Sequence, residues 1–136
     1  MKVRVGVCGL GGMGLAYCLA LKRIEKANLV AVCTRRPATA REFAAKFHAR
    51  PYRQLSDMVK SADLDAVLIA TPNYLHAQQS IIALEAKKHV LCTKPIATTL
   101  NEADKMIAAN IAILSLVSKP ECPDVSLIVS PSYRND

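Results

Sequence analysis

The amino-acid sequence predicts a single α/β domain with a doubly wound parallel sheet, and three observations support this class. A short apolar strand near the first residue leads directly into a glycine-rich turn and then into an apolar helix. Short apolar runs then alternate with segments of helical periodicity along most of the 136 residues. The runs are apolar almost throughout, as in parallel strands that are covered on both faces. This alternation favours parallel strands joined by right-handed helical crossovers.

The glycine-rich turn follows a predicted strand through Val3, Val5 and Val7 and has the pattern G-x-G-x-x-G. In this pattern the first glycine permits a tight turn, the second lets a pyrophosphate approach the backbone, and the third lets the helix pack close to the strand. The unpaired amide groups of the first helical turn then face the phosphates. The turn therefore predicts dinucleotide binding, and the alternative is a turn that serves only packing. The residues expected at the pyrophosphate are Gly9, Leu10, Gly11, Gly12, Met13 and Gly14.

The remaining elements are predicted from apolar periodicity and from turn residues. Pro37 suits the first turn of the second helix, and Ser56 is expected to cap a short helix. Thr99 and Glu102 have the spacing of a capping box. Residues 111–117 either continue the last helix to about residue 118 or form a buried strand, and the periodicity leaves both open. Strands are expected at residues 3–7, 28–34, 49–52, 65–70, 89–92 and 125–129, and longer helices at 15–21, 37–47 and 75–87.

The composition excludes several classes of partner. The chain carries a net charge of +7, but its basic residues are scattered, and four Tyr and two Phe offer little stacking for bases. Nucleic acid is therefore not an expected partner, and an anionic cofactor explains the charge more simply. No apolar run approaches the roughly 18 residues of a membrane span. The first residues form a strand rather than a signal peptide, so neither a membrane nor export is expected.

The five cysteines form no C-x-x-C pair and have no spacing typical of metal ligands, so no metal site is expected. Three of them close predicted strands in apolar surroundings, which predicts buried and reduced thiols. Such thiols fit a reducing, cytoplasmic compartment. The five are Cys8, Cys18, Cys33, Cys92 and Cys122.

The end of the second predicted strand indicates which cofactor is bound. NAD-binding domains usually place a carboxylate about 20 residues beyond the glycines, where it accepts from the ribose 2′-hydroxyl. Here the strand ends in Thr34, Arg35 and Arg36, with no carboxylate. Guanidinium groups bind phosphate oxygens in a bidentate way, and the threonine hydroxyl adds a donor. We therefore expect NADP(H) in preference to NAD(H), with NAD as the lesser alternative; otherwise the two arginines are a solvated surface pair.

Three stretches of the sequence together resemble the Gfo/Idh/MocA oxidoreductase family. They are the glycine motif, residues 65–76 and residues 89–97, and with the helix that follows they span about residues 3–107. The resemblance implies a Rossmann-type cofactor domain and NAD(P)-dependent oxidation or reduction of a sugar, an inositol or a related polyol. The family's Glu-Lys-Pro motif supplies a lysine near the nicotinamide and the substrate. Lys94 and Pro95 match that motif, so Lys94 is the expected catalytic residue.

The residues themselves support a reacting end at the same place. Residues 71–73 and 93–95 each follow a predicted strand, and open α/β sheets bind ligands at the carboxyl ends of their strands. A lysine there can hold a hydroxyl or carbonyl oxygen and stabilise developing negative charge, or it is an exposed surface lysine. Asn73 either contacts the nicotinamide ribose or caps a helix, and His76 has either a cofactor role or a structural one. The residues expected at this end are Thr71, Pro72, Asn73, His76, Lys94 and Pro95.

Two departures from the family pattern qualify the expected activity. Thr93 stands where the family has glutamate, so a charge partner for Lys94 must come from elsewhere or be absent. Residues 1–129 are expected to form the cofactor domain, and residues 130–136 resemble the link to a second α/β domain, which is missing. The chain alone is therefore expected to be weakly active or inactive.

Its expected partners are a dinucleotide, a sugar or polyol once the second domain is supplied, and another copy of the chain. The alternatives are a non-catalytic NAD(P)H-binding sensor and a domain that associates through the uncovered surfaces.

Overall fold

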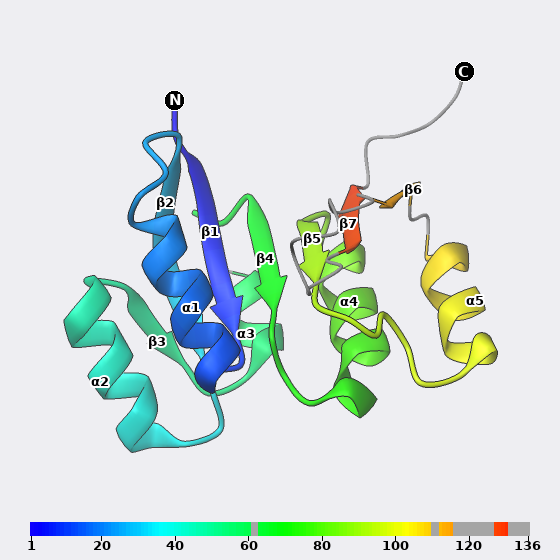
Figure 1. Ribbon diagram of the computed structural model, residues 1–136, viewed down its shortest axis with the longest axis horizontal. Coiled ribbons are helices and arrows are strands. Elements are labelled where there is room, and N and C mark those ends of the chain that lie inside the picture. Colours follow the sequence, from blue (N-terminus) through cyan, green and yellow to red (C-terminus); the bar gives the residue numbers. More distant parts are fainter. Residues whose placement is uncertain (61–62, 110–111, 116–126, 131–136) are drawn as a thin grey trace.

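The sheet has seven strands in the order β3-β2-β1-β4-β5-β7-β6 (Figure 1). The computed structural model describes residues 1–60, 63–109, 112–115 and 127–130. The strands β1 to β5 are mutually parallel, which confirms the doubly wound prediction. The strands are β1 Val3–Cys8, β2 Ala27–Cys33, β3 Arg50–Tyr52, β4 Ala66–Ile69, β5 His89–Cys92, β6 Ala112–Ser115 and β7 Leu127–Ser130. The helices are α1 Gly12–Leu21, α2 Pro37–Phe47, α3 Leu55–Val59, α4 His76–Glu85 and α5 Leu100–Ala108, with a 3₁₀ turn η1 at Asn73–Leu75.

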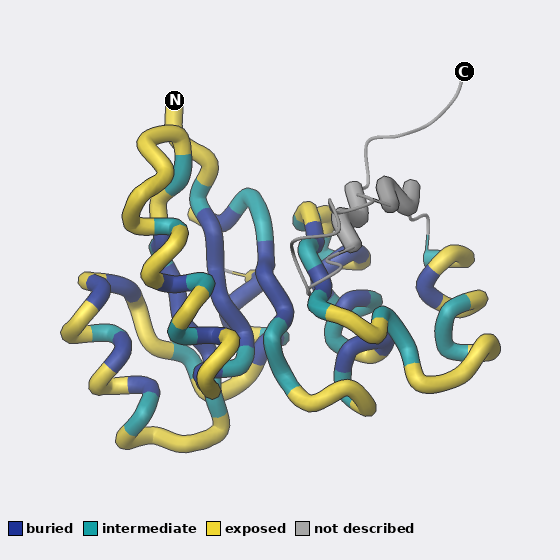
Figure 2. The backbone as a smooth tube through the Cα atoms, viewed as in Figure 1, coloured by how far each residue is buried: buried dark blue, intermediate teal, exposed yellow. Residues whose placement is uncertain are grey.

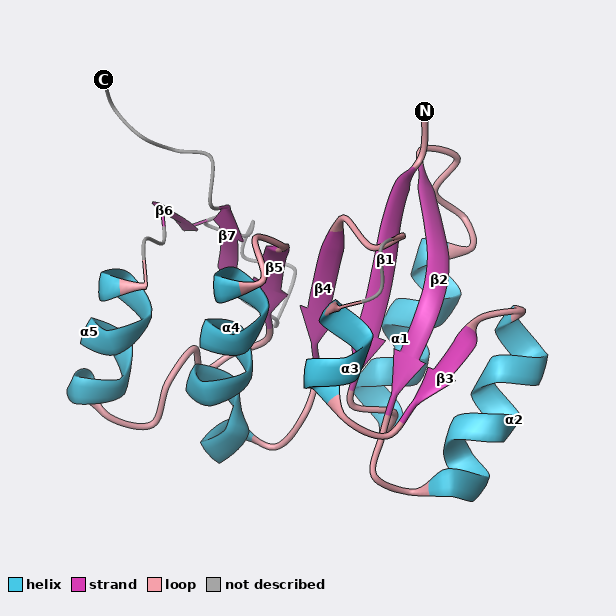
Figure 3. Cartoon of the chain, turned by 180° about the vertical axis from the view of Figure 1, so that it is seen from behind, coloured by secondary structure: helices cyan, strands magenta, loops and turns pink. Residues whose placement is uncertain are grey.

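Helices cover both faces of the parallel strands. Helices α1 and α2 pack over β1, β2 and β3 on one face, and α3 and α4 pack on the other; Figures 1 and 3 show the two sides. Successive side chains of a strand point to opposite faces, and β1 illustrates the consequence. Val5 and Val7 belong to the core with Phe43 and Phe47 of α2, whereas Cys8 belongs to the core with Met58 of α3. Figure 2 shows these strands buried between exposed helix surfaces.

The strand order reverses at β1, which determines where a ligand can bind. β1 pairs with β2 on one side and with β4 on the other. The last residue of β1, Cys8, lies opposite Cys33 of β2 and Ile69 of β4. The carboxyl ends of these three strands therefore meet at one edge of the sheet. In open α/β sheets the ligand crevice lies outside such a reversal.

Near the end of the described chain an open alternative is decided, and at α3 a local prediction is wrong. Of the two possibilities for residues 111–117, the strand is confirmed over residues 112–115, which form β6 and pair with β7, and α5 ends at Ala108. β7 is antiparallel to β5 and β6, so the sheet is not parallel throughout. Ser56 is not a helix cap: Gln54 holds the N-cap position in extended backbone, and Ser56 lies inside α3.

Other predictions hold with shifted boundaries. Helix α1 begins at Gly12, which is closer to the glycine turn than predicted. The capping box of Thr99 and Glu102 is present, with the threonine hydroxyl accepting from the Glu102 amide at 3.2 Å. Strand β7 runs through Ser130, and residues 125–126 and 131–136 lie outside the described residues. The proposed boundary at 129 therefore remains a proposal.

Four of the five cysteines are buried free thiols, as predicted: Cys8, Cys18, Cys33 and Cys92. Cys122 lies outside the described residues. Across the part of the chain that is described, no group of three or more His, Cys, Asp or Glu side chains is arranged to hold a metal ion. Within the same residues, every helix is too short or too polar to span a bilayer.

An ion pair joins the amino ends of β1 and β4. It lies at the end of these strands opposite the carboxyl ends, where the ligand crevice is expected. The Arg4 guanidinium donates from Nε and Nη2 to the two carboxylate oxygens of Asp65, at 2.9 and 2.7 Å. The Arg4 backbone amide donates to the same carboxylate at 2.8 Å. These hydrogen bonds hold the pKa of Asp65 well below its ordinary value. Arg4 also reaches Asp63, whose side chain is 85% exposed.

The lowered pKa of Asp65 predicts a specific pH dependence of stability. Its contribution is present above the unfolded pKa of about 3.9 and is lost as pH falls through the lower folded pKa. We therefore expect the free energy of unfolding to fall between about pH 5 and pH 2. Asp65→Asn should lower stability at neutral pH and flatten this dependence in urea unfolding curves, whereas Asp63→Asn should leave it nearly unchanged. An equally steep loss in the Asp65→Asn protein would contradict this assignment.

Candidate dinucleotide site

A cavity of about 690 Å³ opens at the carboxyl ends of β1, β2 and β4, where the strand order reverses. Its walls come from the glycine turn, the loop after β2, the start of α3 and the segment from the end of β4 into α4. The lining residues are Cys8, Gly9, Leu10, Gly11, Gly12, Met13, Cys33, Thr34, Arg35, Arg36, Arg53, Gln54, Leu55, Ser56, Ala70, Thr71, Pro72, Leu75, Gln78, Gln79 and Ile82.

The three glycines of the motif differ in the space around them. Gly9 has a φ of +96°, and a Cβ there would lie 2.5 Å from the Ala70 backbone. A Cβ on Gly14 would lie only 1.9 Å from the Gly9 carbonyl oxygen, so this glycine lets α1 pack against the turn. A Cβ on Gly11 would meet nothing within 4 Å. Two glycines are therefore required by packing, and the third leaves open space at the cavity.

This open space lies at the amino end of α1. Gly11 is the N-cap residue, and no side chain caps the helix. The first amide groups of a helix have no intrahelical partner, and they carry the positive end of the helix dipole. Gly12 and Met13 of this first turn line the cavity. The arrangement fits an anionic group such as a pyrophosphate.

The wall of the cavity after β2 is cationic. Arg35 and Arg36 line it, and the Arg36 backbone amide donates to the Thr34 hydroxyl at 3.4 Å. Sequence reasoning missed Arg53, which follows β3 and lines the same cavity. A strand was predicted at residues 49–52, but only the pairing of β3 with β2 brings Arg53 to this edge of the sheet. Among the described residues that line this cavity, none is an aspartate or a glutamate.

The predicted nicotinamide residues divide into two groups. Thr71 and Pro72 line the cavity, and the Thr71 hydroxyl donates to Oε1 of Gln79 at 2.5 Å. The other residues predicted at the nicotinamide do not line the cavity; they are Asn73, His76, Lys94 and Pro95. Gly14, which was predicted at the pyrophosphate, does not line it either. Asn73 begins the turn η1 and is not an N-cap residue, since Pro72 and Leu75 hold those positions.

His76 connects the loops that follow β4 and β5. It is fully buried, and its Nδ1 and Nε2 atoms each lie 2.7 Å from a carbonyl oxygen, of Pro95 and Thr71 respectively. Carbonyl oxygens only accept, so the ring nitrogen that carries the proton donates to the carbonyl beside it. The ring therefore fixes the Lys94–Pro95 segment beside Thr71 without itself lining the cavity. This geometry supports the structural alternative for His76.

Thr93, which precedes the exposed Lys94, is bonded to the end of β4 beside the His76 ring. Its hydroxyl donates to the Ile69 carbonyl at 3.2 Å and lies 3.4 Å from the His76 ring. The end of β5 is thus attached to the end of β4 by both side-chain and main-chain bonds, including the Thr93 amide to the Ile69 carbonyl at 3.1 Å. Lys94 is positioned by this framework on the loop after β5.

The family model described as the oxidoreductase family with an NAD-binding Rossmann fold, Gfo/Idh/MocA, matches residues 3–112. The chain belongs to the Gfo/Idh/MocA family. Within this family, the scyllo-inositol 2-dehydrogenase (NADP(+)) IolU of Bacillus subtilis is 37% identical over 108 residues, which are 79% of this chain and 33% of that protein. The myo-inositol 2-dehydrogenase of Thermotoga maritima is 34% identical over 106 residues, which are 77% of this chain and 32% of that protein.

Solved structures of the Gfo/Idh/MocA family have the same fold. The WlbA dehydrogenase of Bordetella pertussis, in complex with NADH and UDP-GlcNAcA, has a TM-score of 0.76 and 34% identity, and covers 80% of this chain and 34% of that one. A 3-ketoreductase of Actinomadura kijaniata, in complex with TDP-benzene and NADP, has a TM-score of 0.75 and 31% identity. The match covers 80% of this chain and 35% of that one. This Gfo/Idh/MocA chain thus spans about a third of the length of its relatives.

Proposed function

We propose that the cavity binds NADP(H) in preference to NAD(H), as the cofactor site of an oxidoreductase that acts on a sugar, an inositol or a related polyol. The observation that carries the proposal is the cationic wall beside the open Gly11 backbone, whose described residues include no carboxylate. A carboxylate would repel a 2′-phosphate, whereas Arg35 and Arg36 can bind its oxygens. Arg53 adds a third guanidinium on the same side. The relatives that carry NADP or NADH in their structures support the class of cofactor.

The pyrophosphate and the nicotinamide occupy the rest of the cavity in this proposal. The amides of Gly12 and Met13 bind the pyrophosphate, and Thr71 and Pro72 border the nicotinamide. The bound nicotinamide supplies or accepts the hydride. Lys94 donates a hydrogen bond to the reacting substrate oxygen and stabilises the negative charge that develops there. In this role Lys94 is the catalytic residue, and His76 positions its loop.

Titration of the purified chain with NADPH and NADH tests the cofactor proposal. Arg35→Ala and Arg36→Ala should each weaken NADPH binding by about tenfold or more, because a charge-assisted hydrogen bond contributes about 1.5–3 kcal/mol. NADH binding should change little. Arg41→Ala is the matched control, since Arg41 is exposed on α2 and does not line the cavity. Equal affinities of the unmodified chain for NADPH and NADH would overturn the preference.

A second candidate is a non-catalytic NADP(H)-binding sensor. The observation in its favour is Thr93, an uncharged residue bonded to the Ile69 carbonyl where the family motif has a glutamate. The two candidates differ in hydride transfer. Supplying the substrate domain of an inositol dehydrogenase relative in trans should restore dinucleotide reduction, followed by absorbance, in the enzyme and not in the sensor. Lys94→Ala should abolish any restored rate.

A further inference from the structure

Two cysteines meet at the floor of the cavity, and the proposed function uses neither. Cys8 is the last residue of β1 and Cys33 is the last residue of β2, and the two are direct register partners. Neighbouring strands lie about 4.8 Å apart, which is inside the window of about 4.4–6.8 Å between Cα atoms that a disulfide needs. Because paired residues of parallel strands point to the same face, both side chains lie in the core beneath α3.

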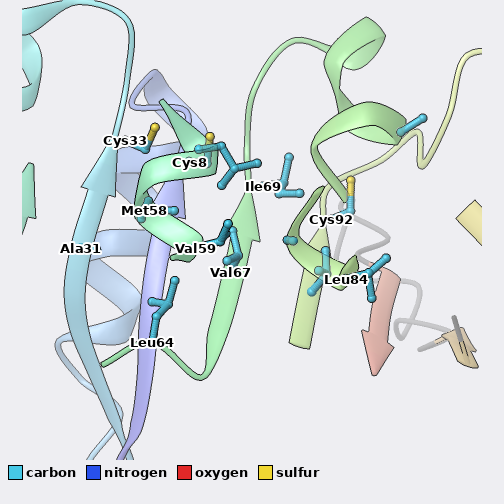
Figure 4. Close-up of a cluster of buried hydrophobic side chains, with 14 of the residues drawn as sticks. Cys8, Ala31, Cys33, Met58, Val59, Leu64, Val67, Ile69, Leu84 and Cys92 are labelled. Atoms are coloured by element: carbon cyan, nitrogen blue, oxygen red, sulfur yellow. The ribbon is translucent and has the colours of Figure 1, made fainter. Parts of the chain in front are cut away.

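The two side chains are neighbours at this end of the sheet. Figure 4 shows them side by side at the ends of their strands, above Met58. Both thiols are free, and both residues are only 3% exposed. Both nevertheless line the dinucleotide cavity. A small oxidant that enters the cavity therefore reaches this pair from one side.

The pair also differs chemically from the other buried thiols. The closeness of the two thiols lowers the pKa of Cys33 and raises that of Cys8. Burial raises the pKa of Cys18 and of Cys92 to about 11. The thiolate is the reactive form of cysteine. The lowered pKa favours Cys33 as the thiol that reacts first, and Cys8, its register partner, lies where it can resolve the oxidised form.

We propose that Cys8 and Cys33 are a redox-sensitive dithiol, which hydrogen peroxide converts to a reversible disulfide and which bound dinucleotide shields. The Cys33 thiolate attacks one peroxide oxygen and the O–O bond breaks. The leaving hydroxide takes up the proton that the Cys33 thiol had released, so the products are a sulfenic acid and water. The Cys8 sulfur then attacks the sulfenic sulfur. The S–S bond forms, the S–O bond breaks, and a second water leaves with the Cys8 proton. Two thiols are oxidised by two electrons and one peroxide is reduced.

The location gives the disulfide a consequence for binding. Cys8 directly precedes Gly9, and Cys33 directly precedes Thr34 of the cationic wall. The Gly9 amide already donates to the Cys33 carbonyl at 2.9 Å. A covalent bond between these strand ends therefore acts on the two segments that, in the proposed function, hold the pyrophosphate and the 2′-phosphate. The shielding part of the proposal rests on that function, whereas the oxidation part does not.

Peptide mapping without reductant tests the oxidation directly. After treatment of the intact chain with hydrogen peroxide, we expect a cross-linked peptide that joins Cys8 and Cys33, a mass loss of two hydrogens, and full reversal by dithiothreitol. Cys33→Ser and Cys8→Ala should each abolish the cross-link. Cys92→Ser is the control, because Cys92 is a buried strand-end thiol paired with Ile69 rather than with a cysteine. Irreversible oxidation of Cys33 alone, or a cross-link to another cysteine, would overturn the proposal.

Repeating the oxidation with saturating NADP⁺ tests the shielding. We expect the rate of cross-linking to fall at least tenfold, as measured by the fraction of linked peptide over time. Calorimetry on the same sample reports whether NADP⁺ is bound. An unchanged rate with NADP⁺ bound would overturn the shielding. Absence of NADP⁺ binding would count against the proposed function instead. The cross-link in the unmodified chain tests the dithiol separately in either case.

Discussion

Gly14→Ala is expected to lower the free energy of unfolding by about 3 kcal/mol or more. The added Cβ would lie 1.9 Å from the Gly9 carbonyl oxygen and 2.9 Å from its carbon. Both atoms belong to the backbone, so no side chain can rotate away to relieve the overlap. The helix α1 must instead move off the turn, and its buried contacts through Cys18 would loosen. Urea unfolding followed by far-ultraviolet circular dichroism measures the loss.

Gly12→Ala is the matched control for this prediction. It is the same substitution in the same helix, but the new Cβ would meet nothing within 4 Å. Because alanine restricts the unfolded chain more than glycine does, the variant should be as stable as the parent or more stable by up to about 1 kcal/mol. If the Gly14→Ala protein unfolds at the same urea concentration as the Gly12→Ala protein, the close approach of α1 to the turn is not what stabilises this part of the fold.

The parallel strands were predictable because their signal is local. An apolar run such as residues 65–70, bounded by turn residues, indicates a buried strand whatever lies elsewhere. The direction of β7 has no such signal, since parallel and antiparallel strands share the period of two. The run at residues 111–117 was ambiguous for a related reason. Its assignment as strand β6 depends on pairing with β7, a partner that the local sequence does not specify.

More of the predicted site residues line the cavity at the glycine turn and after β2 than after β4 and β5. A glycine turn exposes backbone amides and an arginine presents a guanidinium group, so their residue types and positions in the sequence already indicated an anion site. Arg53 was missed because β3 has only three residues, and its alignment with β2 is a matter of tertiary pairing. The role of His76 was also undecided, because only the fold reveals that both of its ring nitrogens meet carbonyl oxygens of other segments.

Gly11→Ala is expected to leave the fold intact and to weaken NADPH binding by about ten- to a hundredfold. Gly11 has a φ of −86°, which alanine adopts freely, and an added Cβ would meet no protein atom within 4 Å. Stability should therefore stay within about 0.5 kcal/mol of the parent. The methyl group would instead occupy the space through which a pyrophosphate reaches the first amides of α1. An overpacked contact costs about 1–3 kcal/mol, and each 1.4 kcal/mol is tenfold in affinity.

The comparison with Gly12→Ala isolates this effect. Both positions are exposed at the cavity and free of protein contacts, so the two variants should be equally well folded. They differ in the motif, which requires glycine at position 11 and accepts any residue at position 12. Calorimetry should therefore show near-parental NADPH affinity for Gly12→Ala and a large loss for Gly11→Ala. Equal affinities in the two variants would mean that the pyrophosphate does not approach the backbone at Gly11, and the open space there would need another occupant.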